Sequence, residues 1–233
     1  MVRDKSVSKR IGIMGGAFNP FHTGHLRHAI EIKEELFLDE IQLVPSYNHP
    51  HKEGLLPYDI RITCIEKSIE HLDFIKINTI EEHIIGKSYT DSMLTQWKKD
   101  NPNDFPYFLM GIEDFAVLPT WHCGTKLPLI VPLIIVSRNG KTAEDFYQIA
   151  QSYWDNCTIK VNNLNLPLIN QKKAQVFVNN QEYCQFIQIP NLEITATHIR
   201  ELWIKQKNLQ GLLNPNVIHF LDKNYALIQK YWQ

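Results

Sequence analysis

Two glycines and two histidines lie close together near the start of the chain, in the segment GGAFNPFHTGHL that covers residues 15–26. Gly15 and Gly16 let backbone N–H groups approach an anion closely, and a helix beginning just after them adds about half a positive charge. His22 and His25 are three residues apart, so both rings can face one pocket and donate hydrogen bonds to phosphate oxygens. The segment is therefore predicted to bind a nucleoside triphosphate.

This segment differs from the two common phosphate-binding loops, because it contains neither G-x-x-x-x-G-K-[ST] nor G-x-G-x-x-G. Kinase-like and ordinary dinucleotide-binding sites are therefore disfavoured. A second anion-binding candidate, ITATHIR, covers residues 194–200. Thr195 and Thr197 at a helix start and the guanidinium of Arg200 can hold phosphate oxygens through hydroxyl, backbone and charge-assisted contacts.

The composition limits the class of protein and its partners. The chain has 233 residues, of which 44% are hydrophobic, and this suits one large α/β domain. The formal net charge of -1 gives no global positive field, so neither nucleic acid nor a membrane surface is an expected partner. No C-x-x-C pair, no secretory segment and no run near the roughly 20 apolar residues of a membrane span is found. We expect a cytoplasmic protein with reduced thiols.

Short apolar runs alternate with longer amphipathic stretches, which is the pattern of a parallel sheet with crossover helices. The predicted strands are 11–14, 41–45, 74–79, 107–110, 133–137 and 186–190. The predicted helices are 24–37, 58–72, 90–99, 197–206 and 215–231. Residues 156–180 are rich in Asn and Gln, show no clear period and are predicted to form loops and irregular strand. The histidine segment thus falls between the first strand and the first helix.

Five motifs carry a resemblance to a known family. GGAFNPFHTGHL resembles the G-G-x-F-[DN]-P-x-H-x-G-H signature of the nucleotidylyltransferase superfamily, and residues 194–200 resemble its I-S-x-T-x-I-R element with Thr195 in place of Ser. Three further segments resemble bacterial nicotinate mononucleotide adenylyltransferases. They are VPS with the PHK that ends at Lys52, SYT at 88–90, and PTWH at 119–122. The matches run in the family's order from Gly12 to about Tyr225.

The resemblance implies a fold that agrees with the strand pattern. This fold is a single doubly wound, Rossmann-like parallel sheet with flanking helices and a C-terminal helical segment, and it binds ligands at the carboxyl ends of its strands. One nucleotidylyltransferase domain is expected over residues 1–233. Its core would cover about 10–140, a variable stretch about 141–185, and the C-terminal ATP-binding element and helices about 186–233.

The resemblance also implies a reaction: transfer of AMP from ATP to nicotinate mononucleotide, giving nicotinate adenine dinucleotide and pyrophosphate in NAD biosynthesis. The attacking phosphate is already an anion, so direct in-line attack needs no general base and no covalent intermediate. The residues implied as catalytic are His22, His25, Lys52 and Arg200, with Arg200 on the leaving pyrophosphate. Mg²⁺ would accompany ATP, and no metal ligand is predicted in the protein.

The implied binding residues fall into two sets. The ATP-binding set is Gly15, Gly16, Ala17, Phe18, Gly111, Glu113, Ser137, Arg138, Ile194, Thr195 and Thr197. The set for nicotinate mononucleotide is Asn19, Tyr89, Thr90, Trp121 and His122. Trp121 would stack on the pyridine ring, and backbone N–H groups near its neighbours would receive the carboxylate, which favours the acid over the amide. Glu113 departs from the family's G-x-D element, so its role is less well defined.

Several alternatives stay open at this point. Phosphopantetheine adenylyltransferase and an enzyme that prefers the nicotinamide mononucleotide share the phosphate motifs. A metal-binding sensor could use His22, His25 and His28 with His49 and His51 nearby, although no close cysteine or carboxylate completes that set. A catalytically inactive nucleotide-binding regulator is the third alternative. A homo-oligomer is compatible with the sequence.

Overall fold

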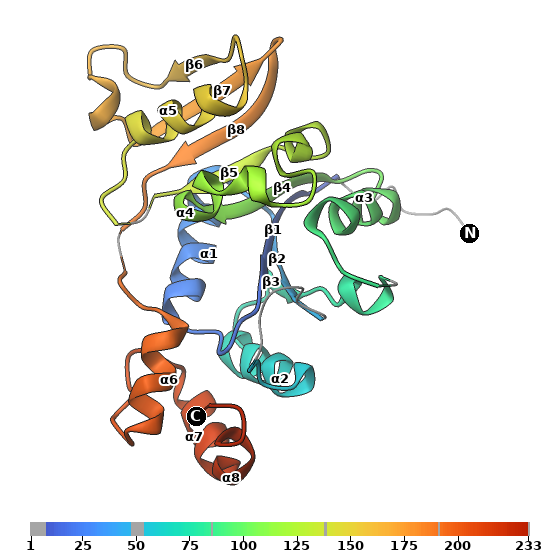
Figure 1. Cartoon of the computed structure of the whole chain (residues 1–233), viewed down its shortest axis with the longest axis vertical. Helices are drawn as coiled ribbons and strands as arrows, with labels where there is room; N and C mark the ends of the chain where they lie inside the picture. Colours follow the sequence, from blue (N-terminus) through green and yellow to red (C-terminus); the bar gives the residue numbers. More distant parts are fainter. Residues whose placement is uncertain (1–7, 48–53, 85, 138, 191, 233) are drawn as a thin grey trace.

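An eight-stranded sheet forms the centre of the computed structural model, which describes residues 8–47, 54–84, 86–137, 139–190 and 192–232 (Figure 1). The strands are β1 (Arg10–Gly16), β2 (Glu40–Pro45), β3 (Ile75–Ile77), β4 (Phe105–Gly111), β5 (Leu133–Val136), β6 (Thr158–Val161), β7 (Lys173–Val178) and β8 (Gln181–Ile187). Their order is β3-β2-β1-β4-β5-β8-β7-β6. All pairs from β3 to β8 in this order are parallel, which confirms the predicted doubly wound parallel sheet for these six strands.

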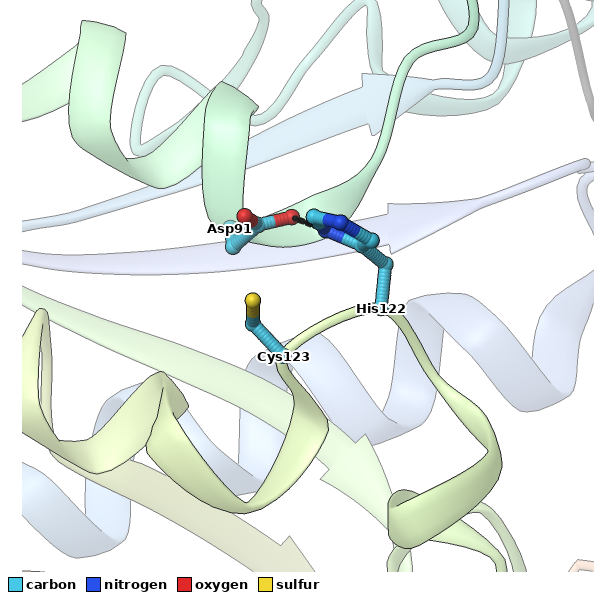
Figure 2. Close-up of side chains that lie close together, drawn as sticks. All are labelled: Asp91, His122 and Cys123. Carbon is cyan, nitrogen blue, oxygen red and sulfur yellow. Dashed lines mark hydrogen bonds and ion pairs between the residues drawn. The ribbon is translucent and has the colours of Figure 1, made fainter.

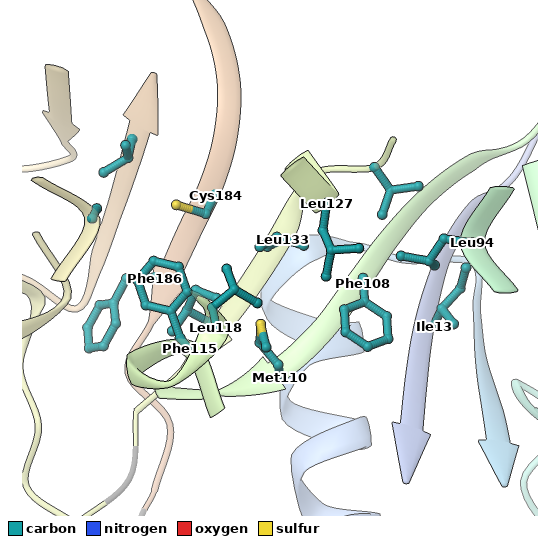
Figure 3. Packing of buried hydrophobic residues seen from close by; sticks show 14 of the residues in the cluster. Ile13, Leu94, Phe108, Met110, Phe115, Leu118, Leu127, Leu133, Cys184 and Phe186 are labelled. Carbon is teal, nitrogen blue, oxygen red and sulfur yellow. The ribbon is translucent and has the colours of Figure 1, made fainter. Parts of the chain in front are cut away.

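Helices cover both faces of the sheet. They are α1 (Thr23–Leu36), α2 (Tyr58–Ile69), α3 (Thr90–Asp100), α4 (Ile112–Ala116) and α5 (Ala143–Tyr153). Ile32 of α1 and Ile65 of α2 share one buried cluster, whereas Leu94 of α3 and Phe115 of α4 belong to another (Figure 3). Because both faces are covered, the central strands are almost continuously apolar, and every residue of β5 is buried.

The connections between strands position the site. From β1 the chain moves outward through β2 to β3, and it then returns to the other side of β1 as β4. The strand order therefore reverses between β1 and β4, and this switch point is where sheets of this class bind ligands. The carboxyl ends that meet there carry Gly15 and Gly16 on β1 and Gly111 on β4.

The stretch after β5 differs from the sequence prediction. Residues 156–180 contain β6, the short 3-10 helix η4 (Leu168–Asn170) and β7, and the strands β6, β7 and β8 pair antiparallel. Helix α5 was not predicted, and β8 begins at Gln181 rather than at residue 186. The single parallel sheet is thus extended by an antiparallel edge, which lies at the opposite end of the molecule from the C-terminal helices (Figure 1).

The C-terminal segment folds against α2. It contains α6 (Ala196–Ile204), α7 (Pro215–Lys223) and α8 (Tyr225–Ile228), which share a third buried cluster with α2. The predicted helix 215–231 is broken at Asn224, whose side-chain amide donates to the carbonyl oxygen of Phe220 at 2.8 Å. Such local hydrogen bonds compete with helix continuation. Of the helices described, none is long and apolar enough to cross a membrane.

Candidate active site

The two histidines cap helix α1 through each other. The backbone N–H of His22 donates to Nδ1 of His25 at 3.3 Å, and the backbone N–H of His25 donates to Nδ1 of His22 at 3.4 Å. The rings stack with their centroids 3.7 Å apart. Because each Nδ1 accepts a hydrogen bond, the neutral form of each ring carries its proton on Nε2. The local fold therefore fixes the tautomer in which Nε2 is the donor.

Gly24 between the histidines is required by this packing. A Cβ atom at Gly24 would lie 3.0 Å from both Cε1 and Nδ1 of His22, so a side chain would push that ring away. The ring of His25 is held from two further sides by Phe18, edge-on at 5.2 Å, and by Phe21, stacked at 5.4 Å. The ring orientation is thus set by packing before any ligand is present.

A cavity of about 660 Å³ opens at the switch point of the sheet. It brings together predicted residues from β1, α1, β4, α6 and the segment after α4. These residues are Gly15, Gly16, Ala17, Phe18, Asn19, His25, Gly111, Trp121, Thr197 and Arg200. His28 and Asp114 also line the cavity, and neither belongs to the predicted catalytic or binding sets. Its size and mixed polar and apolar lining suit a nucleotide with an aromatic ring.

Other predicted residues lie near this cavity without lining it. His22 is only 6% exposed, sits behind His25, and lines a separate cavity of about 440 Å³. The other predicted site residues that the structure describes but that do not line the cavity are Tyr89, Thr90, Glu113, His122, Ser137, Ile194 and Thr195. Lys52 and Arg138 are outside the described residues. The ligand contacts assigned to all of these residues stay predictions.

Three of these outlying side chains have local partners. The carboxylate of Glu113 accepts from the side-chain amide of Asn139 at 2.7 Å. The hydroxyl of Ser137 is buried and accepts from the backbone N–H of Ile189 at 3.1 Å. Thr195 caps α6, since its hydroxyl accepts from the backbone N–H of His198 at 3.1 Å. The cap fixes the start of the helix that carries Thr197 and Arg200.

Arg200 connects helix α6 to the segment after β1. Its Nη1 donates to the carbonyl oxygen of Asn19 at 2.9 Å, and its Nη2 donates to the hydroxyl of Thr197 at 3.0 Å. Partial burial lowers the pKa of the Arg200 guanidinium, although the nearby carboxylate of Glu201 opposes the shift. The side chain is therefore oriented at the cavity wall by two of its own hydrogen bonds.

Arg61 is a structural centre that the sequence pattern did not reveal. It lies on the buried face of α2 and is 2% exposed. Its guanidinium donates to the carbonyl oxygens of Ala17 at 2.7 Å, Ser46 at 2.7 Å and Leu56 at 2.9 Å. Burial lowers its pKa, whereas Tyr58 and Glu81 raise it. One side chain thus joins the ends of β1 and β2 to the segment before α2.

The SYT and PTWH segments lie side by side, as their predicted shared role requires. The ring of Tyr89 stacks on that of His122 with centroids 4.6 Å apart. The Nδ1 atom of His122 lies 3.0 Å from a carboxylate oxygen of Asp91. Trp121, the residue just before His122, is partly buried and lines the cavity. The two segments thus lie next to each other, and Trp121 is their residue at the cavity wall.

The chain matches a known family and named relatives over most of its length. A family model described as Cytidylyltransferase-like matches residues 13–202. A probable nicotinate-nucleotide adenylyltransferase of Trichlorobacter lovleyi is 27% identical over 217 residues, which cover 92% of this chain and 97% of the relative. A protein of the same name from Clostridium tetani is 28% identical over 225 residues, with 96% and 98% of the two chains covered.

Solved structures share the fold. The Plasmodium falciparum nicotinic acid mononucleotide adenylyltransferase complexed with NaAD superposes with a TM-score of 0.72 at 21% identity, covering 95% of this chain and 98% of that chain. A structure of the Plasmodium falciparum enzyme complexed with APC gives a TM-score of 0.70 over the same shares. The family match spans both the histidine segment and the arginine of α6, so this chain belongs to the Cytidylyltransferase-like family.

Proposed function

We propose that this chain transfers AMP from ATP to nicotinate mononucleotide, forming nicotinate adenine dinucleotide and pyrophosphate in NAD biosynthesis. The observation that carries the proposal is the single cavity that joins Gly15 and Gly16, His25, Arg200 and Trp121 at the switch point. It combines phosphate-binding groups with an aromatic side chain for a flat ring. Relatives over nearly the whole chain carry the name of this activity.

The chemistry requires positioning rather than a base. An oxygen of the mononucleotide phosphate forms a bond to the α-phosphorus of ATP. The bond from that phosphorus to the bridging oxygen breaks, and pyrophosphate leaves with the electron pair. Since the nucleophile is an anion, no proton has to be removed. The protein contributes by aligning two anions and by stabilising the charge that develops between them.

The described geometry supports a division of roles. The Nε2–H of His25 donates to an oxygen of the α-phosphate, because its Nδ1 is held by the backbone N–H of His22. Thr197 and Arg200 hold the leaving pyrophosphate, and the backbone around Gly15 and Gly16 receives the remaining phosphate oxygens. His22 orients His25 by stacking and capping. Lys52 is assigned positive charge toward the phosphates on the family resemblance alone.

A divalent metal accompanies ATP in nucleotidyl transfer of this family, and we assign Mg²⁺. Asp114 is the carboxylate among the residues that line the cavity. A single carboxylate fits an ion that arrives with the triphosphate and is held mainly by phosphate oxygens and water. When bound, such an ion neutralises charge on the triphosphate and so favours departure of pyrophosphate.

Trp121→Ala is expected to raise KM for nicotinate mononucleotide about 2- to 12-fold, the equivalent of an offset-stacking energy of about 0.5–1.5 kcal/mol. The KM for ATP should change little, because the phosphate-binding groups lie on other elements. Steady-state kinetics with each substrate varied in turn measures both values. Trp121→Phe keeps an aromatic face and serves as the matched control, with values near those of the unchanged protein. Equal losses for both substrates would exclude the stacking role.

Isotope exchange tests direct transfer. With ATP, Mg²⁺ and labelled pyrophosphate but no mononucleotide, no label should enter ATP, because no adenylyl-enzyme forms. Adding nicotinate mononucleotide should start exchange, and nicotinate adenine dinucleotide and pyrophosphate should then form in equal amounts. Label in ATP without any acceptor would contradict direct attack. Absence of exchange and of product under every condition would contradict the proposed reaction itself.

A further inference from the structure

We infer that Asp91, His122 and Cys123 form a binding site for a divalent cation of the zinc class (Figure 2). The site lies next in sequence to Trp121, which lines the cavity. Cation binding there is independent of the proposed reaction. This site differs from the metal-binding alternative that the sequence offered, which used His22, His25 and His28. It combines a thiolate, an imidazole and a carboxylate instead of histidines alone.

The ligand atoms are already close together. A ring nitrogen of His122, a carboxylate oxygen of Asp91 and Sγ of Cys123 all lie within 4.8 Å of one another, and Nδ1 of His122 is 3.0 Å from the Asp91 oxygen. Figure 2 shows the sulfur of Cys123 directed toward the Asp91–His122 pair. In tetrahedral zinc sites, with bonds of about 2.0–2.3 Å, ligand atoms are about 3.5 Å apart. Small side-chain adjustments therefore suffice to enclose an ion.

The donor types select the class of cation. Cysteine sulfur, histidine nitrogen and aspartate oxygen are all ligands of Zn²⁺, whereas Mg²⁺ and Ca²⁺ take oxygen donors. Three protein ligands leave one tetrahedral position for water. The side chain of His122 is 52% exposed and that of Asp91 is 17% exposed, so a cation can reach the site from solvent.

Local structure restricts the position of each ligand. Asp91 is in the first turn of α3, and the ring of His122 is fixed by stacking on Tyr89. Cys123 adopts a left-handed backbone conformation with φ of 51°, which residues other than glycine rarely adopt. The following Gly124 has no room for a side chain, since a Cβ there would lie 1.9 Å from the carbonyl oxygen of Leu118. The ligands are therefore preorganised.

A bound cation would join two segments that are far apart in the sequence. It would link the start of α3 to the loop between the 3-10 helices η2 (Leu118–Thr120) and η3 (Gly124–Leu129). That loop contains Trp121, so the ion would stiffen one wall of the cavity. The consequence is a higher melting temperature of the full chain when the cation is bound.

Titration of the metal-free full-length protein with Co²⁺ tests this site, because cobalt replaces zinc and reports a bound thiolate by a charge-transfer band. We expect saturation at one equivalent with that band, and displacement by Zn²⁺. Cys123→Ser should abolish the band. His122→Ala and Asp91→Asn should weaken binding at least about tenfold, a loss that even supporting residues of metal sites can cause.

Matched controls separate this site from other thiols and imidazoles. Cys157→Ser removes a partly buried cysteine, and His198→Ala removes an exposed histidine 3.9 Å from a carboxylate oxygen of Glu201. Both should bind Co²⁺ as the unchanged protein does. An unaltered band in Cys123→Ser, equal binding in His122→Ala, or no saturable thiolate band at all would overturn the proposal.

Discussion

His25→Ala is expected to lower kcat for dinucleotide formation about 10²–10³-fold, which is the effect of removing one preorganised donor to a developing charge. The ring lines the cavity, and its tautomer is fixed by the backbone N–H of His22. Alanine removes the donor and one half of the reciprocal cap. Loss of a cap costs about 1 kcal/mol of stability, so the variant should still fold.

Single-turnover formation of the dinucleotide at saturating substrates measures this effect without contribution from product release. His71→Ala is a suitable control, because the His71 side chain is 88% exposed. Among the described residues, it pairs only with the neighbouring Glu70. Its rate should equal that of the unchanged protein. If His25→Ala retained full kcat, donation from His25 to the α-phosphate would be excluded.

Arg61→Met is expected to lower the free energy of unfolding by about 3 kcal/mol. Hydrogen bonds from charged groups contribute about 1.5–3 kcal/mol each, and relief of the buried charge offsets part of the loss of three. Methionine fills much of the volume but donates to none of the carbonyl oxygens of Ala17, Ser46 and Leu56. Because Ala17 lines the cavity, KM for ATP should also rise.

Urea unfolding monitored by tryptophan fluorescence measures the change. Arg27→Met is the control, since the Arg27 side chain is 47% exposed and pairs with Glu31 one turn along α1. Exposed pairs of this kind contribute about 0.3–0.5 kcal/mol, so this variant should unfold almost as the unchanged protein does. Similar losses for both variants would show that the three carbonyl contacts of Arg61 do not stabilise the fold.

The apolar and amphipathic pattern of the sequence predicted the parallel centre of the fold. After β5 the sequence also carries clear local signals, but the prediction did not use them. Helix α5 begins with a reciprocal cap in which Thr142 and Asp145 accept each other's backbone N–H groups. These hydrogen bonds and Lys141 lower the pKa of the Asp145 carboxyl. This T-x-x-D spacing is a helix-start signal that the sequence carries openly. Asn179 and Asn180, with φ of 51° and 63°, likewise form the two-residue turn between β7 and β8.

The candidate site was predictable where its residues are contiguous. The motif from Gly15 to His25 contains both the phosphate-approaching backbone and the capping histidines, so one segment specified its own geometry. Arg61 could not be found in this way, because an arginine in an apolar helix pattern is normally exposed and its acceptors come from three separate segments. Asp91 and Cys123 come together only through the packing of α3 against the PTWH loop.

Pyrophosphate release is the most direct test of the central claim that this chain adenylylates nicotinate mononucleotide. Initial rates would be measured with ATP and Mg²⁺ and with nicotinate mononucleotide, nicotinamide mononucleotide or phosphopantetheine as separate acceptors. We expect fast release with the acid and far slower release with the other two. Release with the amide alone, with phosphopantetheine alone, or with no acceptor would contradict it.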